Sequence, residues 1–289
     1  MTTMGATQEG TRLTVRLKRM WRYPSLVVGL VMFSPILLGS IIVPFISPHG
    51  ATESVAGRQL LPPSSEHLFG TDLFGMDIMT RIFAGGRYDL GVAMVAAVIG
   101  MSFGVIIGGF TGYIGGRFDE LVSRVIEALQ SFPPFIIALA VVSVLGNSLV
   151  VLTGVIALIQ LTYYVRTMRA QAFSIRERAF VESARAIGLR TPAIVFRHII
   201  PNGVRPLIIQ LMINVGGAIL IISLLGFLGL GAQVPTPEWG SMISIGLETA
   251  ITGEWWVWVF PGSAIILTVM SLNLIGDGLR DVLDPRQGG

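Results

Sequence analysis

Residues 26–46 read LVVGLVMFSPILLGSIIVPFI and contain no charged side chain. An α-helix needs about 20 residues to cross a hydrocarbon core of roughly 30 Å, so this stretch is long enough for one crossing. Its apolar residues are continuous, whereas the strands of a membrane barrel alternate over about ten residues. The stretch therefore predicts a transmembrane helix. A cleaved signal peptide is the alternative, but the run is about twice as long as a usual signal-peptide core and lacks an Ala-x-Ala-like exit.

The rest of the chain repeats this pattern. Its 289 residues are 52% hydrophobic and only 13% charged, about half the charged share of an average soluble domain. Further apolar runs lie between Asp89 and Arg117, from about Leu121 onward, and over 206–230 and 255–276. The uncharged stretch 128–165 is too long for one crossing, and it is divided at Gly146-Asn147-Ser148, which is a turn signal. We therefore predict an all-α polytopic membrane protein with about six transmembrane helices.

The basic residues divide unequally between the two faces that six crossings create. One face carries 17 of the 20 Lys and Arg residues, in the N-terminal arm, near Arg117, in segment 166–205 and at the C-terminus. The other carries only Arg58, Arg81 and Arg87. Because loops rich in Lys and Arg stay inside, we expect the first face, with both termini, to be cytoplasmic. This distribution explains the formal net charge of +3 without a nucleic-acid partner.

Several kinds of chemistry are missing from the sequence. There is no cysteine, which excludes disulfides, iron–sulfur clusters and thiol catalysis. A phosphate-binding loop needs Gly-x-x-x-x-Gly-Lys-Ser/Thr, but Lys18 is the only lysine and no such glycines precede it. The expected spans hold almost no ionisable residues, and Arg124 and Glu127 are expected to pair near a helix start. Any nucleotide hydrolysis must therefore be done by another polypeptide.

Two patterns concern how the spans pack. Glycine recurs every four residues at 100, 104, 108, 112 and 116, which leaves one helix face bare and favours close helix packing over a ligand pocket. Ser131-Phe-Pro-Pro134 interrupts the third span, and a kink is expected there because proline removes a backbone donor. The sequence leaves open whether the kinked helix lines a cavity or only fits its neighbours.

The longest inward loop, residues 166–205, reads as two short helices. Ser174-Ile-Arg-Glu177 is a capping-box pattern that predicts a helix start, and Gly188 suits the left-handed position after the helix end. Thr191 as N-cap, with Pro192 at the first helical position, predicts a second helix that ends near Ile200, before Pro201.

The second of these helices has two different sides. Ile194, Val195, His198 and Ile199 form an apolar side, while Arg190 and Arg197 are polar. Such a helix either lies on an anionic lipid surface or docks as a peg into a cytoplasmic partner. Periodicity alone does not decide between the two.

These residues resemble a known family. Glu182-Ser-Ala followed by Gly188, with Pro201-Asn202 thirteen residues further on, is similar to the EAA loop of ABC-importer permeases. Other motifs resemble the C-type permease subunit of dipeptide, oligopeptide and nickel importers: HLFGTDLFGMD at 67–77, SIRERAFVE at 174–182, FLGLG at 227–231, PTPEWGSM at 235–242, and NLIGDGLRD at 273–281, continuing to Asp284-Pro285. Met76 and Ile222 depart from the family, which commonly has arginine and an acidic residue there.

The resemblance implies a function and its partners. In such importers an extracytoplasmic substrate-binding protein delivers substrate to two permease subunits in the lipid bilayer of the bacterial cytoplasmic membrane, and two ATPase subunits inside bind ATP and Mg. This chain would be one permease subunit, with no cofactor and no catalytic residue of its own. Segment 166–205 is implied to be the coupling helix in a groove of one ATPase, with contacts from Glu182, Ala184, Gly188, Pro192, Arg197, His198 and Pro201.

This interpretation divides the chain into segments. Residues 1–25 form a cytoplasmic basic arm, 26–46 the first transmembrane helix and 47–88 an extracytoplasmic loop. Residues 89–285 form a permease core with five transmembrane helices. The core contains the coupling loop at 166–205 and an extracytoplasmic loop at 231–254.

Short peptides are the preferred substrate, and nickel or a metal chelate is the alternative because the same motifs occur in both. The three histidines, His49, His67 and His198, lie outside the expected spans, so we expect no metal ligands along the path. A self-contained channel or carrier would be expected to have intramembrane charges or an inverted repeat. An intramembrane enzyme would need a clustered acid, base or metal set. The sequence shows none of these features.

Overall fold

The computed structural model describes residues 23–283. The basic arm at 1–25 lies almost entirely outside the described residues, and so does Asp284-Pro285. Within 23–283 the regular structure is helical, apart from one isolated β-bridge between Thr71 and Asp77. The all-α fold is therefore confirmed.

The helices fall into a long and a short group. The long ones are α2 (Pro24–Ile46), α3 (Ile78–Ile114), α6 (Leu149–Arg176), α10 (Arg205–Phe227) and α12 (Trp256–Leu283). The short ones are α4 (Gly116–Gln130), α5 (Pro134–Leu145), α7 (Ala179–Ala186), α8 (Thr191–Ile194), the π-helical turn η1 (Val195–Ile199), α9 (Ile200–Gly203) and α11 (Trp239–Leu247).

Among residues 23–283, the five long helices are apolar enough to cross a membrane, and α4 with α5 makes a sixth if the pair is one broken span. This pair is bent by 82° at Ser131-Phe-Pro-Pro134, where the kink is predicted. α5 ends at Leu145 and α6 begins at Leu149, on either side of the predicted turn. The expectation of about six spans is confirmed.

α3 begins at Ile78, well before the apolar run that predicts it. Asp77 caps this early start, because its Oδ2 atom accepts a hydrogen bond from the Thr80 N–H at 2.8 Å. Arg81 and Asp89, in the first turns, are buried against protein. The apolar pattern of the sequence does not reveal this first part of α3, because it contains charged residues. In the structure these charged groups are surrounded by neighbouring segments and not by water.

The charged face of α4 differs from the prediction in one pair. Arg124 lies 4.0 Å from Glu120 rather than pairing with Glu127, and both side chains are largely exposed. Residues i and i+4 share a helix face just as i and i+3 do, so the spacing alone allowed either partner.

The glycine stripe at 100–112 packs against α6. A Cβ atom at Gly104 would lie 2.5 Å from Cβ of Tyr164, and one at Gly108 would lie 2.5 Å from the Val165 carbonyl oxygen. The prediction of close helix packing is therefore confirmed for this range. Gly116 does not belong to the stripe, because α3 has ended before it and nothing lies within 4 Å of its Cβ position.

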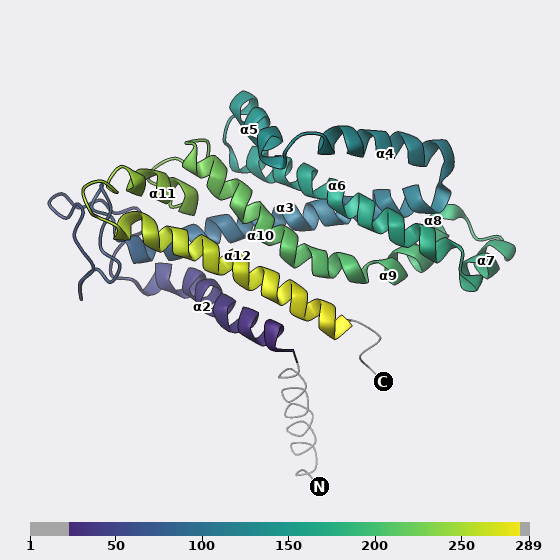
Figure 1. The fold of residues 1–289 in the computed structure, drawn as a ribbon, viewed down its shortest axis with the longest axis horizontal. Coiled ribbons are helices and arrows are strands. Elements are labelled where there is room, and N and C mark those ends of the chain that lie inside the picture. The colour runs from purple at the N-terminus through teal and green to yellow at the C-terminus, as the bar shows by residue number, and fades with distance from the viewer. Residues whose placement is uncertain (1–22, 284–289) are drawn as a thin grey trace, which may run out of the picture.

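The long helices run side by side along the molecule (Figure 1). Segment 47–77 and α11 lie at one end, and α7 and α8 lie at the other, so we call these the α11 end and the α7 end. A large apolar core joins α3, α5, α6, α10, α11 and α12. A second, smaller core lies at the α7 end.

Candidate functional site

The residues expected to couple the chain to a partner lie at 177–204, which we call the α6–α10 segment. It begins later than predicted, because α6 continues to Arg176 and includes Ser174. The predicted capping box is therefore wrong. α7 begins at Ala179, and its N-cap residue Arg178 makes no side-chain capping bond.

The second half of α6 makes polar contacts with α4. The Arg169 guanidinium forms an ion pair with both carboxylate oxygens of Asp119. Arg166 donates a hydrogen bond to Gln130 Oε1 at 2.7 Å. The charges that suggested a loop thus lie on a helix surface that α4 partly covers.

The turn after α7 lies at Gly188, as predicted. Its φ is +78°, a conformation that glycine adopts without strain, and nothing lies within 4 Å of its Cβ position. The Gly188 N–H bonds to the Arg185 carbonyl at 2.9 Å, and the Leu189 N–H bonds to the Ala184 carbonyl at 3.1 Å. Backbone conformation, not space, therefore restricts this position.

The second helical stretch runs from Thr191 to Gly203 and does not end before Pro201, which corrects the prediction. Its N-cap is Arg190, so Pro192 is the second helical residue rather than the first. The π-helical turn η1 precedes Pro201, and the Ile200 N–H bonds to the Val195 carbonyl five residues back. This wider turn accommodates a proline that lacks an N–H and crowds the preceding turn.

The α6–α10 segment has a buried face. Ile194, Val195 and Ile199 of the predicted apolar side are buried, and His198 is half-buried. Ala184 is also buried, at 4% exposure, so this residue packs inward and offers no surface to a partner.

The opposite face is open to solvent. Five of the seven predicted contact residues are exposed there: Glu182, Gly188, Pro192, Arg197 and Pro201. Three large apolar side chains that the sequence did not single out are exposed as well: Phe180, Ile187 and Phe196. The His198 ring lies 6.2 Å from the Phe180 ring. The open face thus combines charge with apolar surface.

The buried face is fixed to the ends of three long helices. Val181 and Ile194 pack in the smaller core with Met168 of α6, Val105 of α3 and Leu207 of α10. The segment is therefore packed against three long helices through its buried face.

A polar contact adds to this attachment. Arg185 Nε donates to the Tyr113 hydroxyl at 3.1 Å, and its guanidinium lies 5.0 Å from the Tyr113 ring centre. This contact joins α7 to the last turn of α3.

The α11 end is held by a buried ion pair. Arg81 Nε lies 3.3 Å from Asp72 Oδ2, and both side chains are almost inaccessible. The Arg81 guanidinium also donates to the carbonyls of Ala51 at 2.9 Å and Pro235 at 3.1 Å. Burial raises the pKa of Asp72, while the Met76 N–H and the charge of Arg81 oppose that rise. Arg81 thus connects segment 47–77 to the segment before α11.

Met76 and Ile222, the two residues that depart from the family pattern, are both buried. The Met76 sulfur accepts a hydrogen bond from Arg81 Nη1 at 2.7 Å, so it takes part in the same buried network. Ile222 is buried in the large apolar core.

The motifs FLGLG and PTPEWG meet at Glu238. Its carboxylate caps α11 by accepting from the Gly240 N–H at 2.6 Å and the Ser241 N–H at 2.8 Å. A side chain at Gly226 or Gly231 would collide with this carboxylate, which is why both positions are glycine. Burial raises the pKa of Glu238 to about 7.

The neighbouring Trp239 joins α11 to α3. Its backbone N–H donates to Asp89 Oδ2 at 3.1 Å, and its indole N–H donates to the Ile82 carbonyl at 2.8 Å. The α11 end is thus assembled from polar contacts between segments that are distant in sequence.

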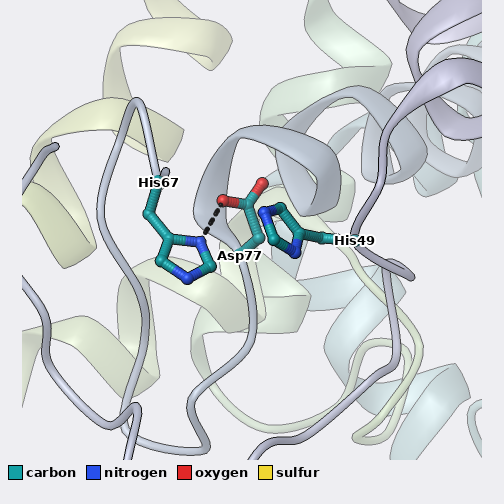
Figure 2. A group of neighbouring side chains, drawn as sticks. All are labelled: His49, His67 and Asp77. Carbon is teal, nitrogen blue, oxygen red and sulfur yellow. Dashed lines mark hydrogen bonds and ion pairs between the residues drawn. The ribbon is translucent and has the colours of Figure 1, made fainter. Parts of the chain in front are cut away.

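Three side chains at this end could hold a metal ion: His49, His67 and Asp77 (Figure 2). One ligand atom from each lies within 4.8 Å of the others. Protein contacts already engage them. His67 Nδ1 lies 2.9 Å from Asp77 Oδ1, Asp77 Oδ2 caps α3, and His49 Nε2 lies 3.2 Å from the Glu66 carbonyl oxygen. We therefore describe the cluster as a contact between loops.

The sequence did not identify this cluster or the Glu238 site, although motif residues form most of both. His67, Asp72 and Asp77 belong to one motif and Glu238 to another. The available signal was the presence of charged and glycine residues within these motifs. The sequence does not show which of these residues contact each other, because the contacts join segments that only the fold brings together.

The bent α4–α5 pair lines a cavity, which answers the question that the sequence left open. A groove of about 410 Å³ lies between α5, α6 and α10, and a neighbouring cavity of about 210 Å³ extends toward Gln130. Both include Pro134, at the bend.

Known proteins are similar to this chain in sequence. The family model described as "Binding-protein-dependent transport system inner membrane component" matches residues 100–289. The chain is 41% identical over 260 residues to the dipeptide transport system permease protein DppC of Alkalihalophilus pseudofirmus, covering 90% of this chain and 85% of that protein. It is 36% identical over 266 residues to the probable D,D-dipeptide transport system permease protein DdpC of Escherichia coli, covering 92% and 89%.

A solved structure shares the fold. The crystal structure of an amino acid ABC transporter with histidines matches with a TM-score of 0.51 at 15% identity, over 70% of this chain and 94% of that one. The family match spans more than half of the chain, and the two relatives match nearly all of it. The chain therefore belongs to the family of binding-protein-dependent transport system inner membrane components, as its motifs indicate.

Proposed function

We propose that this chain is one permease subunit of an ABC importer that moves short peptides into the cytoplasm. The observation that carries the proposal is the identity of 36 to 41% with permease proteins named for dipeptides, over about nine-tenths of the chain. A di/tripeptide transport system permease protein of Pseudomonas aeruginosa, 35% identical, agrees with it. These names favour peptides over nickel.

The partners are those that the family resemblance implies. Two separate ATPase subunits bind ATP and Mg, which agrees with the lack of a phosphate-binding loop in this chain. A second permease subunit completes the path, and an extracytoplasmic substrate-binding protein delivers the peptide. This chain transports and does not itself catalyse a reaction.

The α7 end faces the cytoplasm in this proposal. Arg178, Arg185, Arg190 and Arg197 gather there, and the positive-inside rule places such loops inside. Both termini are then cytoplasmic, and the α11 end meets the binding protein in the bacterial cytoplasmic membrane.

The α6–α10 segment acts as the coupling element. Its exposed face offers Glu182, Arg197 and apolar side chains to an ATPase, while its buried face is packed against α3, α6 and α10. A displacement of the exposed face is therefore passed to three long helices. A short helix that moves as a rigid body suits the conversion of nucleotide-driven closure into helix movement.

Uptake of radiolabelled dialanine tests the substrate. Cells with the complete importer should accumulate it, cells without this chain should not, and excess nickel should not compete. Uptake that is unchanged without this chain, or that nickel abolishes by competition, contradicts the peptide assignment.

Substitutions in the α6–α10 segment test the coupling role against a lipid-surface role. Glu182→Ala removes an exposed charge, and Gly188→Pro forbids the φ of +78°. Both variants should assemble, yet peptide-stimulated ATP hydrolysis and uptake should fall together. For Glu182→Ala the fall should be about tenfold, as expected for losing one charged contact.

A double variant provides the control. If the segment only rests on lipid, Arg190→Ala with Arg197→Ala should be the damaging change, since basic charge then holds it to the membrane. Wild-type coupling in both Glu182→Ala and Gly188→Pro, at normal complex yield, would contradict the coupling role.

A further inference from the structure

An open cavity of about 480 Å³ lies at the α7 end, where four helices meet. The last turn of α3, the end of α6, α7 and the start of α8 form its wall, which consists of Tyr113, Ile114, Arg176, Glu177, Arg185 and Thr191. The cavity thus lies on the flank of the α6–α10 segment, beside α3, and not on the open face that carries Glu182 and Arg197.

Arg185 is held at the cavity wall by Tyr113. Its Nε atom donates to the Tyr113 hydroxyl at 3.1 Å, and its guanidinium lies 5.0 Å from the centre of the Tyr113 ring. The residue is exposed, and among the described residues no hydrogen bond engages its Nη1 and Nη2 atoms. These two atoms form the planar fork with which arginine binds two oxygens of a phosphate. Arg185 is therefore a fixed donor whose fork is open to a ligand.

Arg176 supplies a second positive charge. Its guanidinium lies 4.5 Å from the centre of the Phe173 ring, and its Nη1 atom donates to the Gly112 carbonyl at 3.2 Å. Its Nε atom donates to Glu177 Oε1 at 2.8 Å. Glu177 is the one acid in the wall, and its side chain is 72% exposed. Two guanidinium groups and one carboxylate leave a net positive charge of one, which favours a singly charged anion.

The end of α3 places this cavity at the membrane surface. Ile114 ends the stretch 90–114, which contains no charged side chain, and it is 52% exposed, as a lipid-facing residue would be. Tyr113 is of the aromatic type that membrane interfaces favour. Basic pockets between transmembrane helices on the cytoplasmic side bind anionic lipid head groups. The cavity combines these three features.

We propose that this cavity binds the phosphate of an anionic phospholipid in the cytoplasmic leaflet. Arg185 is the main phosphate ligand and Arg176 the second, while the acyl chains lie on the lipid side of Ile114. The inference uses the proposed cytoplasmic orientation of the α7 end and is independent of the transported substrate. A lipid bound here contacts α3, α6 and α7 at once, so it strengthens the attachment of the α6–α10 segment.

Native mass spectrometry of the complete importer with added phosphatidylglycerol tests the site. Arg185→Gln should weaken binding of the tightest phosphatidylglycerol molecule about tenfold, the loss expected for one charged hydrogen bond. Arg124→Gln is the matched control, since Arg124 is an exposed arginine of α4 that does not line the cavity. It should leave this affinity unchanged. Equal affinity in Arg185→Gln and wild type would overturn the site.

Glu177→Gln changes the charge in the opposite direction. It removes the one acid of the wall and frees Arg176 Nε, so phosphatidylglycerol should bind severalfold more tightly. Structural damage alone would weaken binding in both variants and would not strengthen it in one. Unchanged or weaker binding in Glu177→Gln, at normal complex yield, would contradict the electrostatic account of the site.

Thermal melts of the complete importer identify the source of the phosphate. Phosphatidylglycerol should raise the melting temperature by several degrees, because it binds the folded state. Phosphatidylcholine, whose phosphate is neutralised by its own choline, and inorganic phosphate should not. An equal rise with inorganic phosphate that Arg185→Gln abolishes would overturn the lipid as the source.

An acidic side chain of an ATPase is the other occupant that the charges would admit. In that case Arg185→Gln should release the ATPase subunits during purification and leave phosphatidylglycerol binding unchanged, and this result would overturn the lipid site. None of these measurements depends on peptide uptake, so the lipid site and the proposed function are tested separately.

Discussion

The two ends of the molecule are held together by different kinds of interaction. At the α7 end, apolar side chains such as Val181 and Ile194 attach the α6–α10 segment, and its other face stays exposed. At the α11 end, buried charged and polar groups connect the segments, with Arg81 and Glu238 at the centre. Apolar packing holds a surface without dictating its outer face, whereas a buried ion pair fixes one arrangement.

This difference suits the proposed roles of the two ends. An apolar attachment depends mainly on area, so the α7 end can vary its exposed residues for a partner without losing its hold. A buried charge depends on each of its bonds, so a single change at the α11 end affects the whole end. The comparison predicts that stability and coupling can be damaged separately.

The largest expected effect is at Arg81. Arg81→Leu leaves Asp72 buried without its counter-charge and removes the donor to the Ala51 and Pro235 carbonyls. The free energy of unfolding should fall by about 3–5 kcal/mol, which a thermal melt of the purified protein and its yield in membranes would detect.

Two variants sharpen this prediction. Arg58→Leu breaks an exposed pair with Glu66 and should cost no more than about 1 kcal/mol. Arg81→Leu combined with Asp72→Asn removes the unpaired charge and should recover part of the loss. A stable Arg81→Leu single variant would refute the view that buried charges hold the α11 end.

A smaller effect concerns pH. Burial raises the pKa of Glu238 from the usual 4.5 to about 7, so the folded protein binds this proton more tightly than the unfolded chain. Its contribution to stability is fully present below pH 4.5 and is lost as pH rises through about 7. The melting temperature should therefore fall over this range, and Glu238→Gln should flatten the fall.

Glu248→Gln is the matched control, since it lies at the exposed opposite end of α11. It should keep the wild-type pH dependence. A Glu238→Gln protein that shows the same fall with pH as the wild type would remove Glu238 as its cause.

Much of the fold could be predicted from the sequence because each membrane span is recognised from its own run of apolar residues. Continuous apolar runs, the turn at Gly146-Asn147-Ser148 and the Pro133-Pro134 bend each depend on neighbouring residues alone. The start of α3 could not be predicted in this way. Its first turns carry Arg81 and Asp89, whose partners come from residues near 51, 72 and 239.

The α6–α10 segment shows the same limit. The left-handed Gly188 is a local property and was predictable. Ser174 and Glu177 satisfy a capping pattern, but α6 continues through Ser174 to Arg176, and Arg166 and Arg169 on the same helix contact α4.

The smallest expected effect tests whether the His49–His67–Asp77 cluster at the α11 end needs a metal. His49 is only half-buried and hydrogen-bonds a carbonyl, so His49→Gln should change the free energy of unfolding by less than about 1 kcal/mol. EDTA should leave the melting temperature unchanged, because Asp77 already caps α3 and pairs with His67. His67 Nε2 is buried without a hydrogen-bond partner, so removal and addition of a metal ion test this cluster directly. If EDTA lowers the melting temperature by several degrees and added Zn²⁺ restores it, with both effects absent in His49→Gln, the cluster is a metal site. The α11 end would then be held by a third kind of contact beside its ion pair and its capping carboxylate.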